Sequence, residues 1–177
     1  MSDRENCHET SNEERGLLVA RVFDAPRELL WKAWTEPERF KRWWGPRHYT
    51  APVIRIDFHV GGKYHYCMRS PDGKDFWSTG VYREIVPLER FVAVDSFADA
   101  DGNVVPATYY GMDPDIRLER QVVVTFADLY GKTLMAVRQA GMPAGRGSEF
   151  AVAGWGEAFD KLAASLADPH PDVGSGR

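Results

Sequence analysis

Hydrophobic and polar residues alternate along most of this chain, and the alternation predicts seven strands. The first covers residues 16–23, and six more follow at about 53–60, 63–69, 76–86, 91–97, 120–127 and 133–139. Glycine, proline and aspartate gather between several of these stretches, as is typical of tight turns. Because most connections are short, neighbouring strands are expected to pair antiparallel and to form one curved sheet of about seven strands.

Helical periodicity begins directly after the first strand. Two short helices are predicted over residues 27–34 and 39–44, and the segment that holds them contains four of the six tryptophans of the chain. Thr35 and Glu38 have the spacing of a capping box, in which the two side chains bond to backbone amides at the start of the second helix. The two short helices are therefore expected to bring a cluster of indole rings to one place.

A long helix is predicted over residues 149–167, with Ser148 as its N-cap. Its apolar side chains form one stripe, which consists of Phe150, Trp155, Phe159, Leu162 and Leu166. A stripe of this kind has to be buried against another element. The pattern thus predicts an α+β fold of the helix-grip type, in which the curved antiparallel sheet wraps around the long C-terminal helix.

The same pattern favours one register across the glycines that follow the second strand. A three-residue loop ending at Gly62 pairs Phe58 with Tyr64 and places Asp57 opposite His65. This choice puts the apolar residues of both strands on the concave face, whereas a slip by one residue would turn them outward. Phe58 and Tyr64 are therefore expected inside, and Asp57 and His65 outside.

Composition and charge narrow the organisation and the class of partner. The 177 residues suit one domain over residues 15–167, with a polar leader over 1–14 and a polar tail over 168–177 that are both expected to be disordered. The net charge of −4 comes without any basic face, so nucleic acid is not an expected partner. No apolar run is long enough to span a membrane, and no signal peptide is recognisable, so the expected location is the cytoplasm.

Neither a catalytic motif nor a metal motif emerges from the chain. Asp57, His59, His65 and Cys67 are metal-ligand types close together in sequence, but their spacing matches no zinc pattern and the expected register puts them on the outer face. No nucleophile elbow, phosphate-binding loop or dinucleotide fingerprint occurs. We expect no metal and no cofactor, and the sequence favours a binding protein over an enzyme.

Aromatic side chains are the best candidates for a site. Such side chains usually fill a core, but they also line ligand pockets, and tyrosine hydroxyls can orient a ligand there. The candidate ligand-binding residues are Trp31, Trp34, Trp44, Phe58, Tyr64, Tyr66, Tyr82, Trp155 and Phe159. Gly154 and Gly156 flank Trp155, which indicates either a close approach of helix and sheet or room for a ligand beside the indole. The long segment 98–118 is a candidate lid, with Tyr109, Tyr110 and Met112 on it.

Several of these motifs carry a resemblance to a known family. They include residues 21–26 (RVFDAP), 43–46 (WWGP) and 80–85 (GVYREI), and Gly154 with Trp155 in the long helix. Together they resemble the activator-of-heat-shock-chaperone-ATPase-like family, which belongs to the START-related SRPBCC superfamily. The resemblance runs from about residue 15 to residue 167 and implies a helix-grip fold with a cavity between the sheet and the long helix.

The function predicted from the sequence is the binding of a small hydrophobic molecule, aromatic or lipid-like, in that internal cavity. A first alternative is a protein-interaction module of the co-chaperone type, which contacts a heat-shock chaperone or a second copy of the chain. A second alternative is a cyclase- or hydratase-like enzyme that uses a tyrosine or a histidine in the cavity. A filled core with an exposed apolar patch would favour the first alternative, and a buried titratable group with a perturbed pKa would favour the second.

Overall fold

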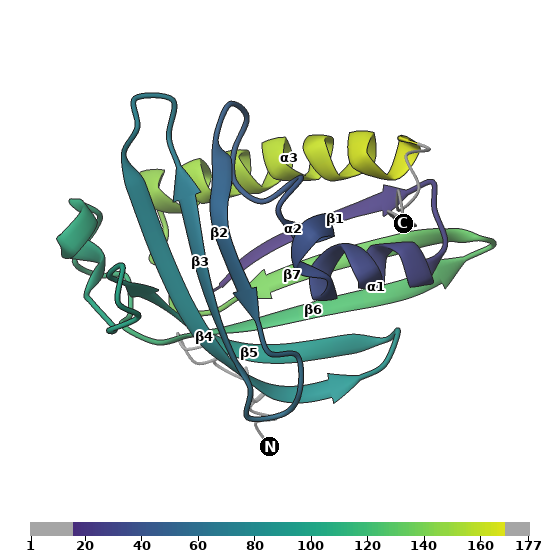
Figure 1. Ribbon diagram of the computed structural model, residues 1–177, viewed down its shortest axis with the longest axis horizontal. Helices are drawn as coiled ribbons and strands as arrows, with labels where there is room; N and C mark the ends of the chain where they lie inside the picture. Colours follow the sequence, from purple (N-terminus) through teal and green to yellow (C-terminus); the bar gives the residue numbers. More distant parts are fainter. Residues whose placement is uncertain (1–15, 169–177) are drawn as a thin grey trace, which may run out of the picture.

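The computed structural model describes residues 16–168. The leader over residues 1–14 and the tail beyond Asp168 lie outside the described residues, so the expectation that they are disordered stays a prediction. The rest of the chain forms an α+β structure (Figure 1).

One antiparallel sheet dominates the described part of the chain. Its seven strands are β1 (Leu17–Phe23), β2 (Thr50–Ile56), β3 (Lys63–Arg69), β4 (Asp75–Val86), β5 (Arg90–Ala98), β6 (Arg120–Leu129) and β7 (Lys132–Gln139). Their spatial order is β1-β7-β6-β5-β4-β3-β2, so β2 to β7 form a meander and β1 joins beside β7. The predicted curved antiparallel sheet is thereby confirmed.

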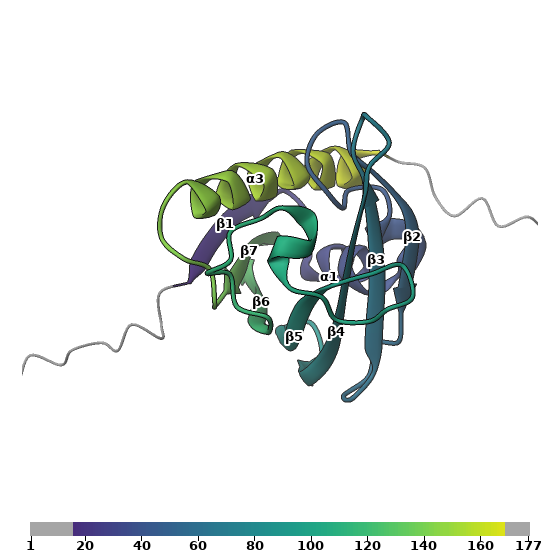
Figure 2. The ribbon, with the colours of Figure 1, turned by 90° about the vertical axis from the view of Figure 1, so that its left-hand side faces the viewer.

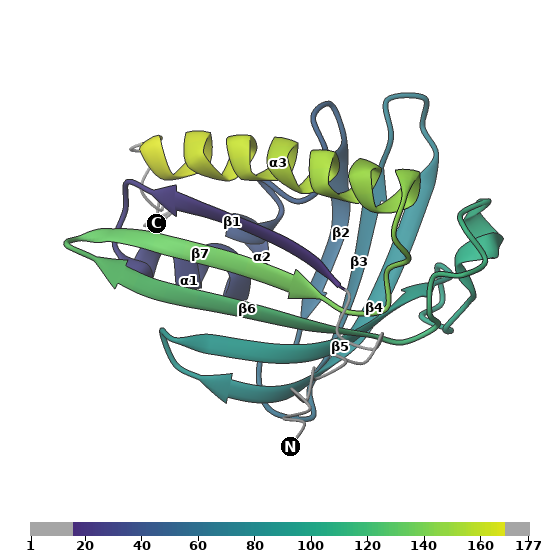
Figure 3. The same cartoon turned by 180° about the vertical axis from the view of Figure 1, so that it is seen from behind.

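Helices cover one face of this sheet, which we call the helix-facing surface. The helices are α1 (Arg27–Thr35), α2 (Pro37–Phe40) and α3 (Arg146–Ala167), and a short 3-10 turn, η2 (Ala107–Tyr110), lies in the connection between β5 and β6. α1 packs on β6 and β7, and α3 runs alongside β1 (Figures 1 and 3). The predicted order of one strand, two short helices, six strands and a long helix is confirmed.

The ends of the two short helices differ from the prediction. Glu36 serves as the C-cap of α1 and as the N-cap of α2, and neither helix has a side-chain cap hydrogen bond at its N-terminus. Thr35 is the last residue of α1, so the capping box with Glu38 is wrong. α2 is a single turn that starts at Pro37, two residues earlier than predicted, and ends at Phe40 instead of residue 44, and residues 41–43 form a turn.

The long helix starts earlier than predicted and its stripe is shorter. Gly145, not Ser148, is the N-cap, and the Ser148 hydroxyl donates to the Gly145 carbonyl over 2.8 Å. Phe150 is 82% exposed, which contradicts its place in the buried stripe. Phe150 precedes Trp155 by five positions, an offset that turns the Phe150 side chain about 140° away from that of Trp155 around the helix axis. Phe159 and Leu162 are fully buried, as expected.

The register between β2 and β3 differs from the prediction by two residues. Ile56, not Phe58, pairs with Tyr64, and Asp57 is not opposite His65. A shift by two residues keeps every side chain on its face, so the hydrophobic pattern does not distinguish the two registers. Tyr64 is buried, Phe58 packs against the core and Asp57 is exposed, so the predicted faces are confirmed.

The glycines before β3 explain the longer connection. Gly61 adopts a left-handed conformation with φ of 86°, as predicted for this loop. A Cβ atom on Gly62 would lie 2.0 Å from the Asp57 carbonyl oxygen, so the chain folds back on itself here more closely than any side chain would permit. β2 therefore stops at Ile56, and residues 57–62 form the turn.

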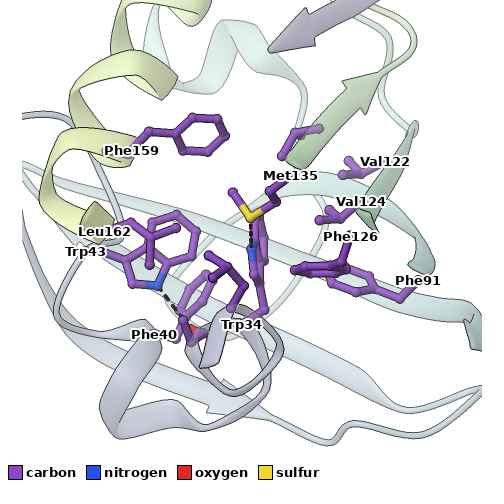
Figure 4. Packing of buried hydrophobic residues seen from close by; sticks show 14 of the residues in the cluster. Trp34, Phe40, Trp43, Phe91, Val122, Val124, Phe126, Met135, Phe159 and Leu162 are labelled. Carbon is purple, nitrogen blue, oxygen red and sulfur yellow. Dashed lines mark hydrogen bonds between the residues drawn. The ribbon is translucent and has the colours of Figure 1, made fainter. Parts of the chain in front are cut away.

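The core lies between α1, α2, α3 and the sheet, and indole rings fill much of it (Figure 4). The Trp34 ring centroid lies 4.8 Å from that of Trp43 and 5.5 Å from that of Phe91. Both buried indole N–H groups find an acceptor: Trp34 donates to the Met135 sulfur over 3.1 Å, and Trp43 donates to the Ala33 carbonyl over 3.0 Å. Neither of these two buried indole nitrogens therefore adds the cost of an unpaired donor to the core.

Candidate functional site

The nine predicted ligand-binding residues come together in one aromatic cluster. Trp34, Tyr64, Tyr66, Tyr82 and Phe159 are buried within it, and Trp31, Trp44, Phe58 and Trp155 pack against it while partly exposed. The tyrosines come from β3 and β4, three of the tryptophans and Phe159 come from helices, and Trp44 and Phe58 come from turns. Most of the cluster is tightly packed, so its buried members have a core role whatever else they do.

Trp155 is the point where α3 meets the short helices. Its ring stacks on Trp34 with centroids 6.1 Å apart and meets Trp44 edge-on at 5.4 Å. Of the flanking glycines, Gly154 would bring a Cβ atom to 3.4 Å from Pro46, whereas a Cβ atom on Gly156 would meet nothing within 4 Å. Gly154 thus lies in contact distance of Pro46, whereas the space beside Gly156 is open.

A polar row crosses the helix-facing surface in the middle of this apolar environment. Tyr64 on β3 pairs with Gly80 on β4, Gly80 pairs with Asp95 on β5, and Asp95 pairs with Arg120 on β6. The Tyr64 hydroxyl donates to Asp95 Oδ1 over 2.6 Å. Arg120 Nη2 donates to Asp95 Oδ2 over 2.8 Å. The carboxylate is therefore held from both sides by residues of the neighbouring strands.

The absence of a side chain at Gly80 permits this row. The Tyr64 ring lies flat over β4 at this position and reaches β5, which a larger residue would prevent. The same ring stacks on Tyr66, with centroids 4.4 Å apart and planes 14° apart. The Tyr66 hydroxyl lies 3.4 Å from that of Tyr82, so two further hydroxyl groups stand close to the row.

Burial shapes the protonation of these groups. It raises the pKa of Asp95 above its ordinary value, while the Arg120 guanidinium acts in the opposite direction. Burial and the neighbouring Asp95 raise the pKa of Tyr64 well above its ordinary value. Burial also raises the pKa of Tyr66 well above its ordinary value and that of Tyr82 to about 12. The tyrosine hydroxyls therefore stay protonated at neutral pH, and that of Tyr64 donates its hydrogen bond to Asp95.

Arg120 is the most deeply buried member of the row. Its side chain is 2% exposed, and its guanidinium carbon lies 4.3 Å from the centroid of the Phe97 ring. Nη1 donates to the Arg117 carbonyl over 3.2 Å, whereas the buried Nε has no acceptor. The cation is thus neutralised by Asp95 and covered by an aromatic face.

Next to the polar row, apolar side chains of the helix-facing surface are only partly buried. Ser78 pairs with Tyr66 on one side and with Phe97 on the other, and Phe76 pairs with Met68, so all of them share the face of Tyr66. Phe76, Ser78, Phe97 and Met68 all keep part of their surface exposed. This part of the sheet is therefore less completely covered than the part that packs into the buried cluster with α1 and α2.

The candidate lid contributes one side chain to this region. The Tyr110 hydroxyl donates to the Ala98 carbonyl over 2.5 Å and accepts from the Trp77 amide over 3.0 Å. Its ring lies 5.3 Å from Phe76 and 6.0 Å from Phe97, measured between centroids. Figure 2 looks onto this connection at the end of the sheet. Tyr110 thus anchors the connection against the partly exposed residues.

The other two predicted lid residues are placed differently. Tyr109 is 59% exposed, although its ring meets that of Tyr110 edge-on at 4.9 Å. Met112 is half-buried, and its amide bonds to the Ala107 carbonyl within the same turn. A role for these two residues as a lid stays a prediction.

Polar contacts tie α3 to the segment after Trp44. The Lys161 ammonium group lies within 3.4 Å of four main-chain carbonyl oxygens, which belong to Trp44, Gly45, Pro46 and Tyr49. Burial lowers the pKa of Lys161. These contacts hold the segment against α3.

The four candidate metal-ligand types do not assemble. Asp57 pairs with His59 over 2.7 Å at the surface, and His65 instead stacks on Trp77 with centroids 4.6 Å apart. Within residues 16–168, no group of three His, Cys, Asp or Glu side chains is close enough to hold a metal ion. The predicted pairing of Asp57 with His65 is wrong because the register is shifted.

A surface depression lies at the C-terminal end of α3, away from the aromatic cluster. Its volume is about 470 Å³, and it is lined by Arg42, Lys161, Ala164, Ser165 and Asp168. It is lined by none of the predicted site residues and by no aromatic side chain. We therefore place the candidate site at the polar row and its partly exposed neighbours instead.

Sequence reasoning missed Asp95 and Arg120, although a signal was present. Asp95 stands between Ala93 and Phe97 in the alternation of β5, on the face that is otherwise apolar. Arg120 begins the face of β6 that continues with Val122. Two opposite charges on apolar faces of strands that are expected to be adjacent indicate a buried ion pair.

Comparison with known proteins agrees with this fold. Residues 24–167 match the family model described as Activator of Hsp90 ATPase homolog 1-like protein. No curated protein matches the chain.

Solved structures share the architecture over most of their length. A crystal structure from Chromobacterium violaceum has 26% identity and a TM-score of 0.71, covering 86% of this chain and 98% of that one. A solution structure from Arthrobacter aurescens has 24% identity and a TM-score of 0.72, and the match covers 93% of this chain and 94% of that one. The crystal structure of the AHSA1 protein from Silicibacter pomeroyi has 21% identity and a TM-score of 0.66, and the match covers 88% of this chain and 99% of that one. Among the helices described for our chain, none is long and apolar enough to cross a membrane.

Proposed function

The chain belongs to the family of Activator of Hsp90 ATPase homolog 1-like proteins, and on that premise we propose that it binds a small hydrophobic molecule between the sheet and α3. The ligand is aromatic or lipid-like, and it lies against the helix-facing surface beside the polar row. The fold of this family, with a curved sheet and a long helix over it, commonly serves to bind hydrophobic ligands.

The observation that carries the proposal is the incomplete burial of Phe76, Ser78 and Phe97 on a surface that is otherwise core. A protein that used this surface only as core would gain about 25 cal/mol for each further Å² of apolar area that it buried. The partial exposure of these residues, with Tyr110 beside Phe76 and Phe97, leaves that free energy available to a ligand. Trp155 and Phe97 supply rings against which an aromatic molecule can stack.

The test is to look for the ligand and for the site separately. Native mass spectrometry of freshly purified full-length protein is expected to detect a co-purifying small molecule. Titration with N-phenyl-1-naphthylamine, an uncharged dye that fluoresces in apolar surroundings, is expected to give saturable binding. A protein that carries no molecule and does not bind the dye would contradict the proposal.

A second candidate function has one specific observation in its favour. On the outer surface of the sheet, Leu18 and Val22 of β1 are 54% and 49% exposed, and Leu134 of β7 pairs with Val22 on the same face. We call these three residues the outer apolar patch. An exposed patch of this kind often marks a contact with another protein, here an interaction of the co-chaperone type.

Stimulation of an Hsp90 ATPase by the purified chain tests this second candidate. The double variant Leu18→Ser, Val22→Ser should abolish stimulation without unfolding the chain, since both side chains are about half exposed. Stimulation that is absent in the wild-type chain, or unchanged in the variant, would contradict a role for the outer apolar patch.

A further inference from the structure

We propose that Asp95 selects the ligand, which is a neutral or cationic aromatic molecule with a hydroxyl or amino group that donates a hydrogen bond to this carboxylate. The inference rests on the proposed function, because it assigns a chemical class to the ligand of the same site. It predicts a preference that a purely apolar surface would not produce.

Accessibility distinguishes the two charged members of the polar row. The side chain of Asp95 is 16% exposed, whereas that of Arg120 is 2% exposed. Of the two charged side chains, that of Asp95 is therefore the more accessible to a molecule that lies against the helix-facing surface. The charge that a ligand meets at this point is negative.

Asp95 has hydrogen-bonding capacity left after its protein contacts. Oδ1 accepts one hydrogen bond, from Tyr64, and Oδ2 accepts one, from Arg120. Each carboxylate oxygen has two lone pairs, so each accepts one further donor. Both protein donors stabilise the ionised form, which is the form that accepts hydrogen bonds most strongly.

Within the described residues, the helix-facing positions of β4 and β5 near the row carry no charge other than that of Asp95. The others are Phe76, Ser78, Gly80 and Phe97, all uncharged. The guanidinium of Arg120 is occupied by Asp95 and the Arg117 carbonyl, and its remaining Nε is covered. A ligand carboxylate would therefore face the carboxylate of Asp95 in a poorly solvated place, which is unfavourable.

Aromatic neighbours complete the description of the ligand. Phe97 follows Asp95 by two residues on the same face of β5, and Phe76 lies on the same face of β4. Both rings are partly exposed. A flat ligand that packs on these rings brings a substituent at its edge to the carboxylate.

Three probes of nearly the same size distinguish the effects of an apolar ring, of a hydrogen-bond donor and of a negative charge on affinity. They are naphthalene, 2-naphthol and 2-naphthoate. Their dissociation constants are measured with the full-length protein by NMR titration at neutral pH. 2-Naphthol should bind about tenfold more tightly than naphthalene, as expected for one hydrogen bond to a charged acceptor. 2-Naphthoate should bind more weakly than naphthalene.

Two variants assign the preference to Asp95. Asp95→Asn should reduce the advantage of 2-naphthol over naphthalene to about twofold or less, because a neutral amide oxygen is a weaker acceptor. Tyr64→Phe removes one protein donor from Asp95 Oδ1, which leaves this oxygen free for the ligand, and should increase the advantage of 2-naphthol over naphthalene. This variant keeps the ion pair of Asp95 with Arg120, which Asp95→Asn weakens. If Asp95→Asn does not fold, the change in Tyr64→Phe decides the question.

The possible outcomes separate the inference from the function on which it rests. If none of the three probes binds, the proposed ligand binding fails and the inference fails with it. If all three bind with equal affinity, or 2-naphthoate binds most tightly, ligand binding stands and the role of Asp95 is overturned. A preference for 2-naphthol that persists in Asp95→Asn also overturns it.

Discussion

The ring of Tyr64 occupies the space that a side chain at Gly80 would need: a Cβ atom there would lie 2.2 Å from Tyr64 Cζ and 2.3 Å from its hydroxyl oxygen. Tyr64 belongs to β3 and its hydrogen-bond acceptor Asp95 belongs to β5, so the ring has to cross β4 to reach it. The polar row therefore requires a residue without a side chain at position 80 of β4.

Replacing this glycine should therefore be costly. Gly80→Ala is expected to destabilise the fold by about 1–3 kcal/mol, since the ring has to leave a packed position. In a Tyr64→Ala background the same replacement should cost little, and urea unfolding of the four proteins measures the difference. Gly147→Ala, on a helical position with nothing within 4 Å of the new Cβ atom, is the matched control and should not destabilise. Equal costs in both backgrounds would contradict the explanation.

The buried ion pair of Asp95 and Arg120 should be sensitive to the loss of either partner. Arg120→Met is expected to cost about 3–5 kcal/mol of unfolding free energy, because it leaves a carboxylate in a poorly solvated place. The double variant Asp95→Leu, Arg120→Met removes both charges and should be more stable than Arg120→Met alone. Chemical unfolding of the single and double variants measures both values, and additive losses would show that the two groups do not depend on each other.

The buried tyrosines predict a loss of stability in alkali. Burial raises the pKa of Tyr82 to about 12, so the folded protein keeps a proton that the unfolded chain releases near pH 10. Unfolding is therefore favoured as the pH rises from about 10 towards 12, and the stabilisation is intact below that range. Tyr64 and Tyr66, whose pKa values are raised in the same direction, should add to the loss.

Absorbance at 295 nm and circular dichroism, followed together against pH, check this prediction. The absorbance of the three buried tyrosinates should appear only with unfolding. Tyr82→Phe should make the alkaline loss of stability shallower. Ionisation of these tyrosines while the circular dichroism is still native would contradict the burial argument.

Trp155 separates a ligand-binding role from a core role. Trp155→Ala is expected to weaken binding of N-phenyl-1-naphthylamine by about 1–3 kcal/mol, if the indole stacks on the dye. Because the ring is partly exposed, the loss of fold stability should be smaller than that of Phe159→Ala, which removes a fully buried ring at a typical cost of about 3–5 kcal/mol. Dye titration and urea unfolding on both variants make the comparison.

The opposite result has a clear meaning. A stability loss in Trp155→Ala as large as that in Phe159→Ala, with undiminished dye binding, would assign Trp155 to the core. The outer apolar patch and a protein partner would then be the better explanation of function.

The architecture was predictable because it depends on periodicity. Strands with one buried face alternate, and α3 carries a stripe with a period of 3.6 residues, so both element types can be recognised without tertiary information. The register across residues 57–62 was not predictable in the same way. A shift by two residues keeps every face unchanged, and the close approach of Gly62 to Asp57 that decides between the registers is a tertiary contact.

The site was predictable in part for a related reason. Aromatic residues such as Trp34 and Tyr66 are recognised by type, and the structure brings the predicted ones into one cluster. Asp95 and Arg120 are recognised only as a pair, because a single charged residue in a strand usually points to solvent. Their pairing depends on β5 and β6 being neighbours, with a connection of more than twenty residues between them in the sequence.

The carbonyl groups around Lys161 have a consequence for the response of the protein to salts. Backbone carbonyl oxygens that converge on one point can coordinate a sodium or potassium ion, whereas here the chain provides its own cation on α3. The order of residues 44–49 should therefore be indifferent to which alkali metal the buffer contains. The order of this loop depends instead on the positive charge of the Lys161 ammonium group. Acylation of Lys161 would remove that charge and release the loop.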